Sequence, residues 1–213
     1  MNTPTITSHT SRTVSVSWTA LTTAADRGGA TITSYGLWYA ASPYGTWTEW
    51  FGYATDQTLT STTVTGLTPN TAYKFKVAAE NIHGWGTDSA LSASQTTDTD
   101  VPDAPTNVLT TVASSGLGVD ITWNAITSNG AAVTKVKVTI KHQDGTYTSE
   151  TVNCDGETDS NIVTNRKCTI PFTVLRATPY FLVYPNEVVA KVAGFNSVGW
   201  GSESAISTAG ATI

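Results

Sequence analysis

Residues 67–81 read Leu-Thr-Pro-Asn-Thr-Ala-Tyr-Lys-Phe-Lys-Val-Ala-Ala-Glu-Asn, and they determine the fold more clearly than any other stretch of the chain. Within them, Tyr73, Phe75 and Val77 alternate with two lysines. A period of two residues is the pattern of a strand with one buried face and one solvated face. The Thr-Pro-Asn that precedes the strand is a turn signal, because proline and asparagine both favour turn dihedrals. The stretch therefore predicts a turn followed by a half-buried strand.

The composition extends this prediction to the whole chain. Of the 213 residues 39% are hydrophobic and 13% charged, while about 40 are threonine, a β-branched residue that favours strands. No segment shows a convincing helical periodicity, so we expect an all-β protein. The net charge of −5 argues against a nucleic acid partner, which would require clustered basic residues. The apolar runs are too short to insert into a membrane.

The chain repeats itself. Residues 81–90, Asn-Ile-His-Gly-Trp-Gly-Thr-Asp-Ser-Ala, recur at 196–205 as Asn-Ser-Val-Gly-Trp-Gly-Ser-Glu-Ser-Ala. Upstream, Gly-Ala-Thr-Ile-Thr at 29–33 corresponds to Gly-Ala-Ala-Val-Thr at 130–134. Each of these copies follows a predicted strand that ends in tryptophan (Trp18 and Trp123). Such internal similarity predicts two copies of one structural unit.

The two copies meet in residues 97–105, where two prolines and three aspartates favour a short, extended linker. We therefore predict one domain over residues 1–98 and a second over residues 99–213. The offset between the copies grows along the chain, which indicates an insertion of about residues 154–186 in the second domain.

The first copy resembles the fibronectin type III family. Residues 67–81 look like that family's E–F corner and F strand, Trp18 like its strand-B tryptophan, and residues 35–39 like its strand C. The resemblance implies two tandem immunoglobulin-like (fibronectin type III) β-sandwiches, the second divergent. It also implies that Tyr73 is a tyrosine corner, with a buried ring and a hydroxyl bonded to the backbone upstream.

The second copy departs from the family's pattern in its core. Counting back from Trp200 places Val188 and Ala190 where the first copy has Tyr73 and Phe75. The lost volume must be filled, because a large-to-small change in a core costs roughly 2–5 kcal/mol. We expect apolar side chains of the insertion to fill it: Leu175, Tyr180, Phe181, Leu182 and Tyr184.

The chain has two cysteines, Cys154 and Cys168, both within the predicted insertion. Two thiols cannot complete a structural zinc site, which needs about four ligands. A disulfide is the better interpretation, and it favours an extracellular or cell-surface location. Because no signal peptide follows Met1, we expect the chain to be part of a longer precursor.

No catalytic, cofactor or metal site is expected. The histidines His9, His83 and His142 are isolated in the sequence, and no nucleophile–base arrangement or phosphate-binding loop accompanies them. The acidic stretches at 98–103 and 155–159 offer oxygen ligands for Ca²⁺, but they lack the full EF-hand spacing, and solvated loops are the simpler interpretation.

Tryptophans are the candidate interaction residues. An aromatic-rich stretch contributes Trp38, Trp47 and Trp50, together with neighbours that include Phe51 and Tyr53. Exposed rings could bind a protein or, less plausibly, stack on sugars, and lysine stems could instead cover them. The turns at Gly-Trp-Gly would expose Trp85 and Trp200 at loop tips, so we expect each to contact a neighbouring domain or subunit.

These features predict a non-catalytic structural or adhesion module of tandem repeats, which contacts protein partners or its own copies and could assemble into a filament. Two alternatives stay open. The first is an accessory, carbohydrate-binding module of a secreted hydrolase, for which Trp38, Trp47 or Trp50 would be the ligand site. The second is a ciliary or intracellular scaffold, which free thiols would favour.

Overall fold

The structure is a computed structural model that describes residues 1–52 and 57–213. The chain divides into two compact units, Met1–Thr99 and Asp100–Ile213, whereas the sequence placed the boundary after residue 98. Across the residues described, no helix is long and apolar enough to cross a membrane.

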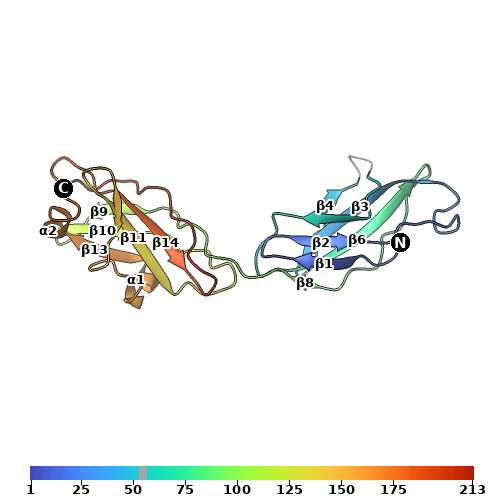
Figure 1. Cartoon of the computed structure of the whole chain (residues 1–213), viewed down its shortest axis with the longest axis horizontal. Helices are drawn as coiled ribbons and strands as arrows, with labels where there is room; N and C mark the ends of the chain where they lie inside the picture. Colours follow the sequence, from blue (N-terminus) through green and yellow to red (C-terminus); the bar gives the residue numbers. More distant parts are fainter. Residues whose placement is uncertain (53–56) are drawn as a thin grey trace. The chain divides into compact units, whose positions relative to one another are not determined.

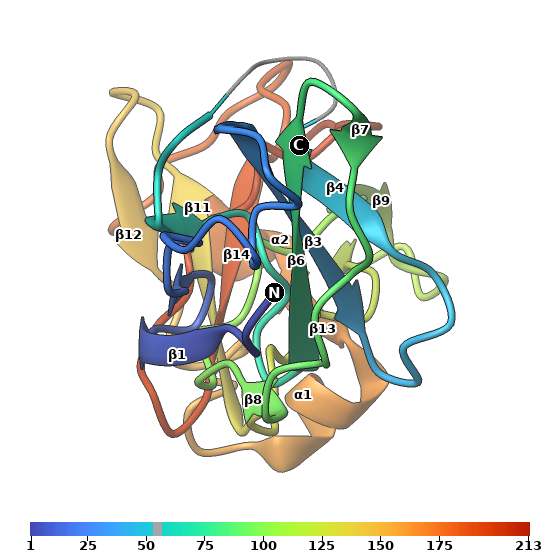
Figure 2. The same cartoon turned by 90° about the vertical axis from the view of Figure 1, so that its right-hand side faces the viewer.

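The first unit is a sandwich of two antiparallel sheets (Figure 1). One sheet has the order β1-β2-β5, formed by Thr5–His9, Val14–Ser17 and Ser61–Val64. The other has the order β4-β3-β6-β7, with β8 also paired to β6; these strands are Thr48–Phe51, Ile32–Ala41, Ala72–Asn81, Gly84–Trp85 and Gln95–Thr96. Figure 2 shows β7 beside the end of β6.

The predicted strand lies at the centre of the second sheet as β6. Tyr73, Phe75 and Val77 are buried in the core between the sheets, whereas the intervening lysines are half-buried on the opposite face. The Tyr73 hydroxyl accepts a hydrogen bond of 3.0 Å from the backbone N–H of Thr68. The tyrosine corner implied by the resemblance is therefore present.

The second unit repeats this arrangement. One sheet has the order β9-β10-β13, formed by Leu109–Val112, Gly118–Thr122 and Lys167–Pro171. The other has the order β12-β11-β14, formed by Tyr147–Ser149, Lys135–Lys141 and Ala190–Phe195. The protein is thus all-β in both units, as predicted, apart from two short helices, α1 (Ser160–Asn165) and α2 (Phe172–Leu175).

The predicted insertion is not one continuous segment. Strand β13 lies within it and pairs with β10 just as β5 pairs with β2 in the first unit. Its alternation buries Cys168 and Ile170 between more exposed residues. Additional chain therefore lies before β13, including α1, and after it, including α2. Neither helix was expected, because a segment of four to six residues is too short to show a helical period.

Cys154 and Cys168 form a disulfide with a Cα–Cα distance of 5.3 Å. The bond attaches the loop before α1 to strand β13. Glu150 supports the same loop: its buried carboxylate accepts hydrogen bonds from the backbone N–H groups of Asn153 and Cys154. The loop is thus held by a covalent bond and by a buried acceptor.

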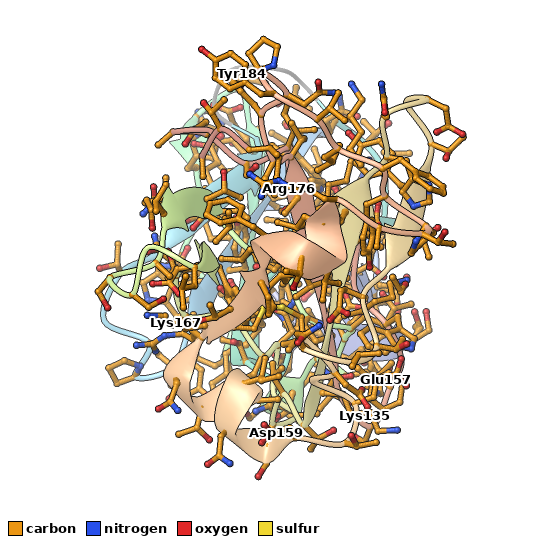
Figure 3. The ribbon with its side chains drawn as sticks, turned by 90° about the vertical axis from the view of Figure 1, so that its left-hand side faces the viewer. Lys135, Glu157, Asp159, Lys167, Arg176 and Tyr184 are labelled. Atoms are coloured by element: carbon orange, nitrogen blue, oxygen red, sulfur yellow. A yellow bond between two sulfur atoms is a disulfide. The ribbon has the colours of Figure 1, made fainter. Side chains whose placement is uncertain are left out.

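The expected filling of the second core is confirmed for three of five residues. Leu175, Tyr180 and Leu182 are buried in one cluster with Val188 and Ala190. The expectation was wrong for the other two: Phe181 is 53% exposed and Tyr184 79% exposed, and Tyr184 lies at the outer edge of the domain in Figure 3. Phe181 has a left-handed backbone (φ 52°) between two buried neighbours, which turns its side chain outward.

Candidate functional site

The outer face of the β4-β3-β6-β7 sheet carries a lysine enclosed by an aromatic ring and a carboxylate. The Lys76 ammonium lies 4.8 Å from the ring centroid of Trp47 and forms a salt bridge with Asp88. Because alternate residues of β6 face outward, Lys74 lies on the same face, with its ammonium 4.8 Å from the ring of Tyr44. We call Trp47, Lys76 and Asp88 the first triad.

The second unit carries the same arrangement at matching positions. Lys191 lies with its ammonium 4.6 Å from the ring centroid of Tyr147 and 3.5 Å from a carboxylate oxygen of Glu203. The lysine and the acid of this second triad follow those of the first by the same 115 positions as the repeated Gly-Trp-Gly turns. Sequence reasoning missed both triads, although the shared spacing of twelve residues from lysine to acid was visible in the repeat.

Trp85 does not project from a loop tip, contrary to the expectation from its Gly-Trp-Gly sequence. It lies on strand β7, and its ring packs edge-on against Trp38 with centroids 5.9 Å apart. Gly36 leaves the room for this packing, since a Cβ there would overlap the Trp38 ring and approach that of Trp85. The partly exposed Trp85 ring therefore lies against the buried ring of Trp38 on their own sheet.

Trp200 packs on its own sheet in a related way. Its ring lies 5.2 Å from that of Phe195, and the Lys137 ammonium lies 5.4 Å from its centroid. The strand registers place Lys137 at the position of Gly36, because Gly36 pairs with Ala78 and Lys137 with Ala193. In the second unit the Lys137 stem thus covers the Trp200 ring, whereas in the first unit the Trp38 indole covers the equivalent Trp85 ring.

The remaining tryptophan candidates are distributed between the two faces of their sheet. Trp50 packs against the buried core cluster, and its indole N–H donates to the Thr62 hydroxyl at 3.4 Å. Trp38 is only 8% exposed. Of the three tryptophans in this stretch, Trp47 is the one whose ring is covered by a lysine, Lys76. Tyr53 lies outside the described residues. A platform of several parallel rings for sugar is not formed by the described tryptophans.

Carboxylates elsewhere in the chain accept hydrogen bonds from the backbone and from neighbouring side chains. Burial opposes ionisation of Asp120, but hydrogen bonds from Lys167 and Thr169 outweigh it and lower the pKa of this carboxyl. Asp159 caps helix α1 by accepting the N–H of Asn161, and a hydrogen bond from Thr158 lowers the pKa of Asp155. Among the described residues, no three His, Cys, Asp or Glu side chains cluster as metal ligands.

A further pKa shift occurs in the segment that is added to the second domain. Burial, reinforced by the negative charge of Glu150, raises the pKa of Tyr180 to about 12. The ring of Tyr180 also lies edge-on to His142, with centroids 5.4 Å apart. Tyr180 is thus a core residue that stays neutral around physiological pH.

Comparison with known proteins agrees with this architecture. The fibronectin type III domain profile matches residues 2–95. The FN1–FN3 domains of chicken CNTN1 have a similar fold, with a TM-score of 0.57 and 19% identity over 97% of this chain and 65% of that one. Domains A168–A170 of titin are 26% identical over 46% of this chain and 32% of theirs, at a TM-score of 0.40 that is too low to bear on the fold.

A search of the curated proteins gives no match. The similarity to this family therefore rests on the matched profile and on the strand order that the two units share. Residues 2–95 match the fibronectin type III domain family, and the second domain has the same order of strands.

Proposed function

We propose that the chain is a non-catalytic spacer and protein-interaction module of the cell surface or extracellular space, which associates with copies of itself through its two triad faces. The observation that carries the proposal is the recurrence of an aromatic–lysine–acid triad on the same outer face of both domains. A half-buried aromatic ring beside both charge signs suits a self-complementary interface.

The disulfide supports an extracellular or cell-surface location, because such bonds persist in oxidising compartments. The disulfide also weighs against the alternative of a ciliary or intracellular scaffold, because that alternative would be favoured by free thiols. The burial of Trp38 and the packing of the partly buried Trp50 against the core weigh against the carbohydrate-binding alternative. These observations favour self-association, including a role in a filament, over the two alternatives.

Sedimentation velocity of the full chain over a range of concentrations tests this proposal. We expect concentration-dependent association that the double variant Trp47→Ser, Tyr147→Ser reduces. Thr63→Ala with Thr111→Ala is the matched control, because both threonines are exposed on the opposite sheets. A chain that remains monomeric, or a control pair that weakens association as much as the triad pair, would refute self-association through these faces.

A further inference from the structure

The first domain has an open hollow at the end of the sandwich where β6 turns into β7. It encloses about 410 Å³ and is lined by residues of the loop before β3 and of the β6–β7 turn, among them Arg27, Asn81, Gly84 and Gly86, with Met1 at its edge. A Cβ added at Gly84 would meet no described atom within 4 Å, and one at Gly86 would meet only the Ala79 carbonyl oxygen, at 3.4 Å.

In the second domain, the chain itself fills the matching place. The segment Asp100–Val101–Pro102 runs across the turn between β14 and Trp200 before it enters β9. A Cβ at Gly201 would overlap the Pro102 carbonyl oxygen, and one at Gly199 would come within 3.5 Å of the Val101 side chain. Pro102 is buried there. Gly201 is thus a position where backbone passes too close for a side chain.

Matching asparagines bind the surrounding loops in the same way. The Asn196 side-chain amide donates to the Ser128 carbonyl at 3.0 Å, and its oxygen accepts the N–H of Val198 at 2.9 Å. In the first domain, Asn81 donates to the Arg27 carbonyl at 2.8 Å and accepts the N–H of His83 at 2.9 Å. These two bonds of the asparagine are therefore the same in both domains, whereas Gly28 of the first domain stands where the second has Asn129.

Among the other bonds of Asn196, one distinguishes the two domains. Its amide also donates to the Asp100 carbonyl, at 2.7 Å. The same incoming segment is held by Asn129, which donates to the Val101 carbonyl at 2.8 Å, and by the bond from the Asp100 N–H to the Asn129 carbonyl at 3.0 Å. The site of the second domain therefore holds an extended backbone with an apolar side chain (Val101) and a proline (Pro102).

We propose that the hollow of the first domain is an acceptor site for an extended segment of the Asp-Val-Pro type, joined in line ahead of β1. The register supports this occupant. Leu109 pairs with Thr122 as Thr5 pairs with Ser17, so Pro105 corresponds to Met1. A segment that corresponds to residues 100–104 would thus reach the hollow from immediately before residue 1. The lining holds the basic side chains of Arg27 and His83, which suit its aspartate, and also the Asp26 carboxylate, which accepts a hydrogen bond from the Thr23 hydroxyl at 2.6 Å.

The test adds Asp-Val-Pro-Asp-Ala directly before Met1 of the full chain and compares it with an added Gly-Ser-Gly-Ser-Gly. The first extension is expected to raise the unfolding midpoint of the first domain by about 4 °C or more, a shift typical of one hydrogen-bonded contact in a domain of this size. It is also expected to slow amide exchange around Asn81. Equal midpoints and equal exchange for the two extensions would overturn the proposal.

Glycine variants give a second, independent readout. In the chain without an extension, Gly201→Ala is expected to lower the midpoint of the second domain, whereas Gly86→Ala leaves that of the first nearly unchanged. Gly86→Ala should become destabilising once Asp-Val-Pro-Asp-Ala is present. If it is tolerated equally with both extensions, the segment does not pass Gly86 and the proposal fails. Neither measurement depends on self-association, which sedimentation tests separately.

Discussion

Leu175→Ala is expected to destabilise the second domain strongly and to leave the first domain unchanged. Leu175 is fully buried, at the end of α2, in the cluster that also holds Val188 and Ala190. Those two positions are small where the first domain has Tyr73 and Phe75, so few neighbouring atoms can move in to fill the cavity. We therefore expect a loss of about 3–4 kcal/mol, in the middle of the range for buried leucines.

Chemical denaturation of the full chain measures this loss, with hydrogen exchange of peptides from each domain to separate the two transitions. For a slope of about 1–3 kcal/mol per molar urea, the midpoint of the second domain should fall by roughly 1–4 M. Phe181→Ala is the matched control, because this larger side chain of the same segment is half exposed and should cost under about 1 kcal/mol. Equal losses for the two variants would refute the idea that the added segment fills the core.

Three further predictions concern single interactions. Replacing Cys154 and Cys168 together by alanine should lower the free energy of unfolding of the second domain by about 3 kcal/mol, the value for a loop of this length, measured by denaturation with and without reductant. Tyr73→Phe should cost the first domain about 1 kcal/mol, because one backbone N–H loses its acceptor; an unchanged melting temperature would contradict this. Asp120→Asn should cost about 1–2 kcal/mol at neutral pH. Because the folded state lowers the Asp120 pKa from 3.8, its stabilisation is present above that value and disappears as pH falls through the folded pKa, so wild type and variant should converge in acid.

Much of the fold could be predicted from local patterns. The alternation around Tyr73 placed β6 in the core of a sheet, and the observed strand, Ala72–Asn81, lies within the quoted stretch. The repeat predicted a second unit with the same strands. These inferences succeed because side-chain alternation acts over a few residues and does not depend on distant contacts.

The features that were missed depend on contacts between distant segments. Strand β13 alternates over only five residues, one of them Cys168, so the sequence predicts it as part of an insertion. Its pairing with β10 identifies it as a strand of the sandwich. Trp85 appeared to be a loop-tip residue because its sequence neighbours are glycines. Its position is set by Trp38 and Gly36, more than forty residues earlier in the chain. The triads likewise join three strands or loops that no local pattern links.

The bond between Cys154 and Cys168 has a mechanical consequence. When a chain is pulled from its ends, a covalent bridge carries the force past the residues that it encloses. The fourteen-residue separation would span about 50 Å fully extended, at up to 3.6 Å per residue, whereas the bridged Cα atoms are 5.3 Å apart. The second domain should therefore lengthen by about 45 Å less under oxidising than under reducing conditions. The reach of a stretched chain would in this way depend on redox state, a property relevant to a spacer under tension.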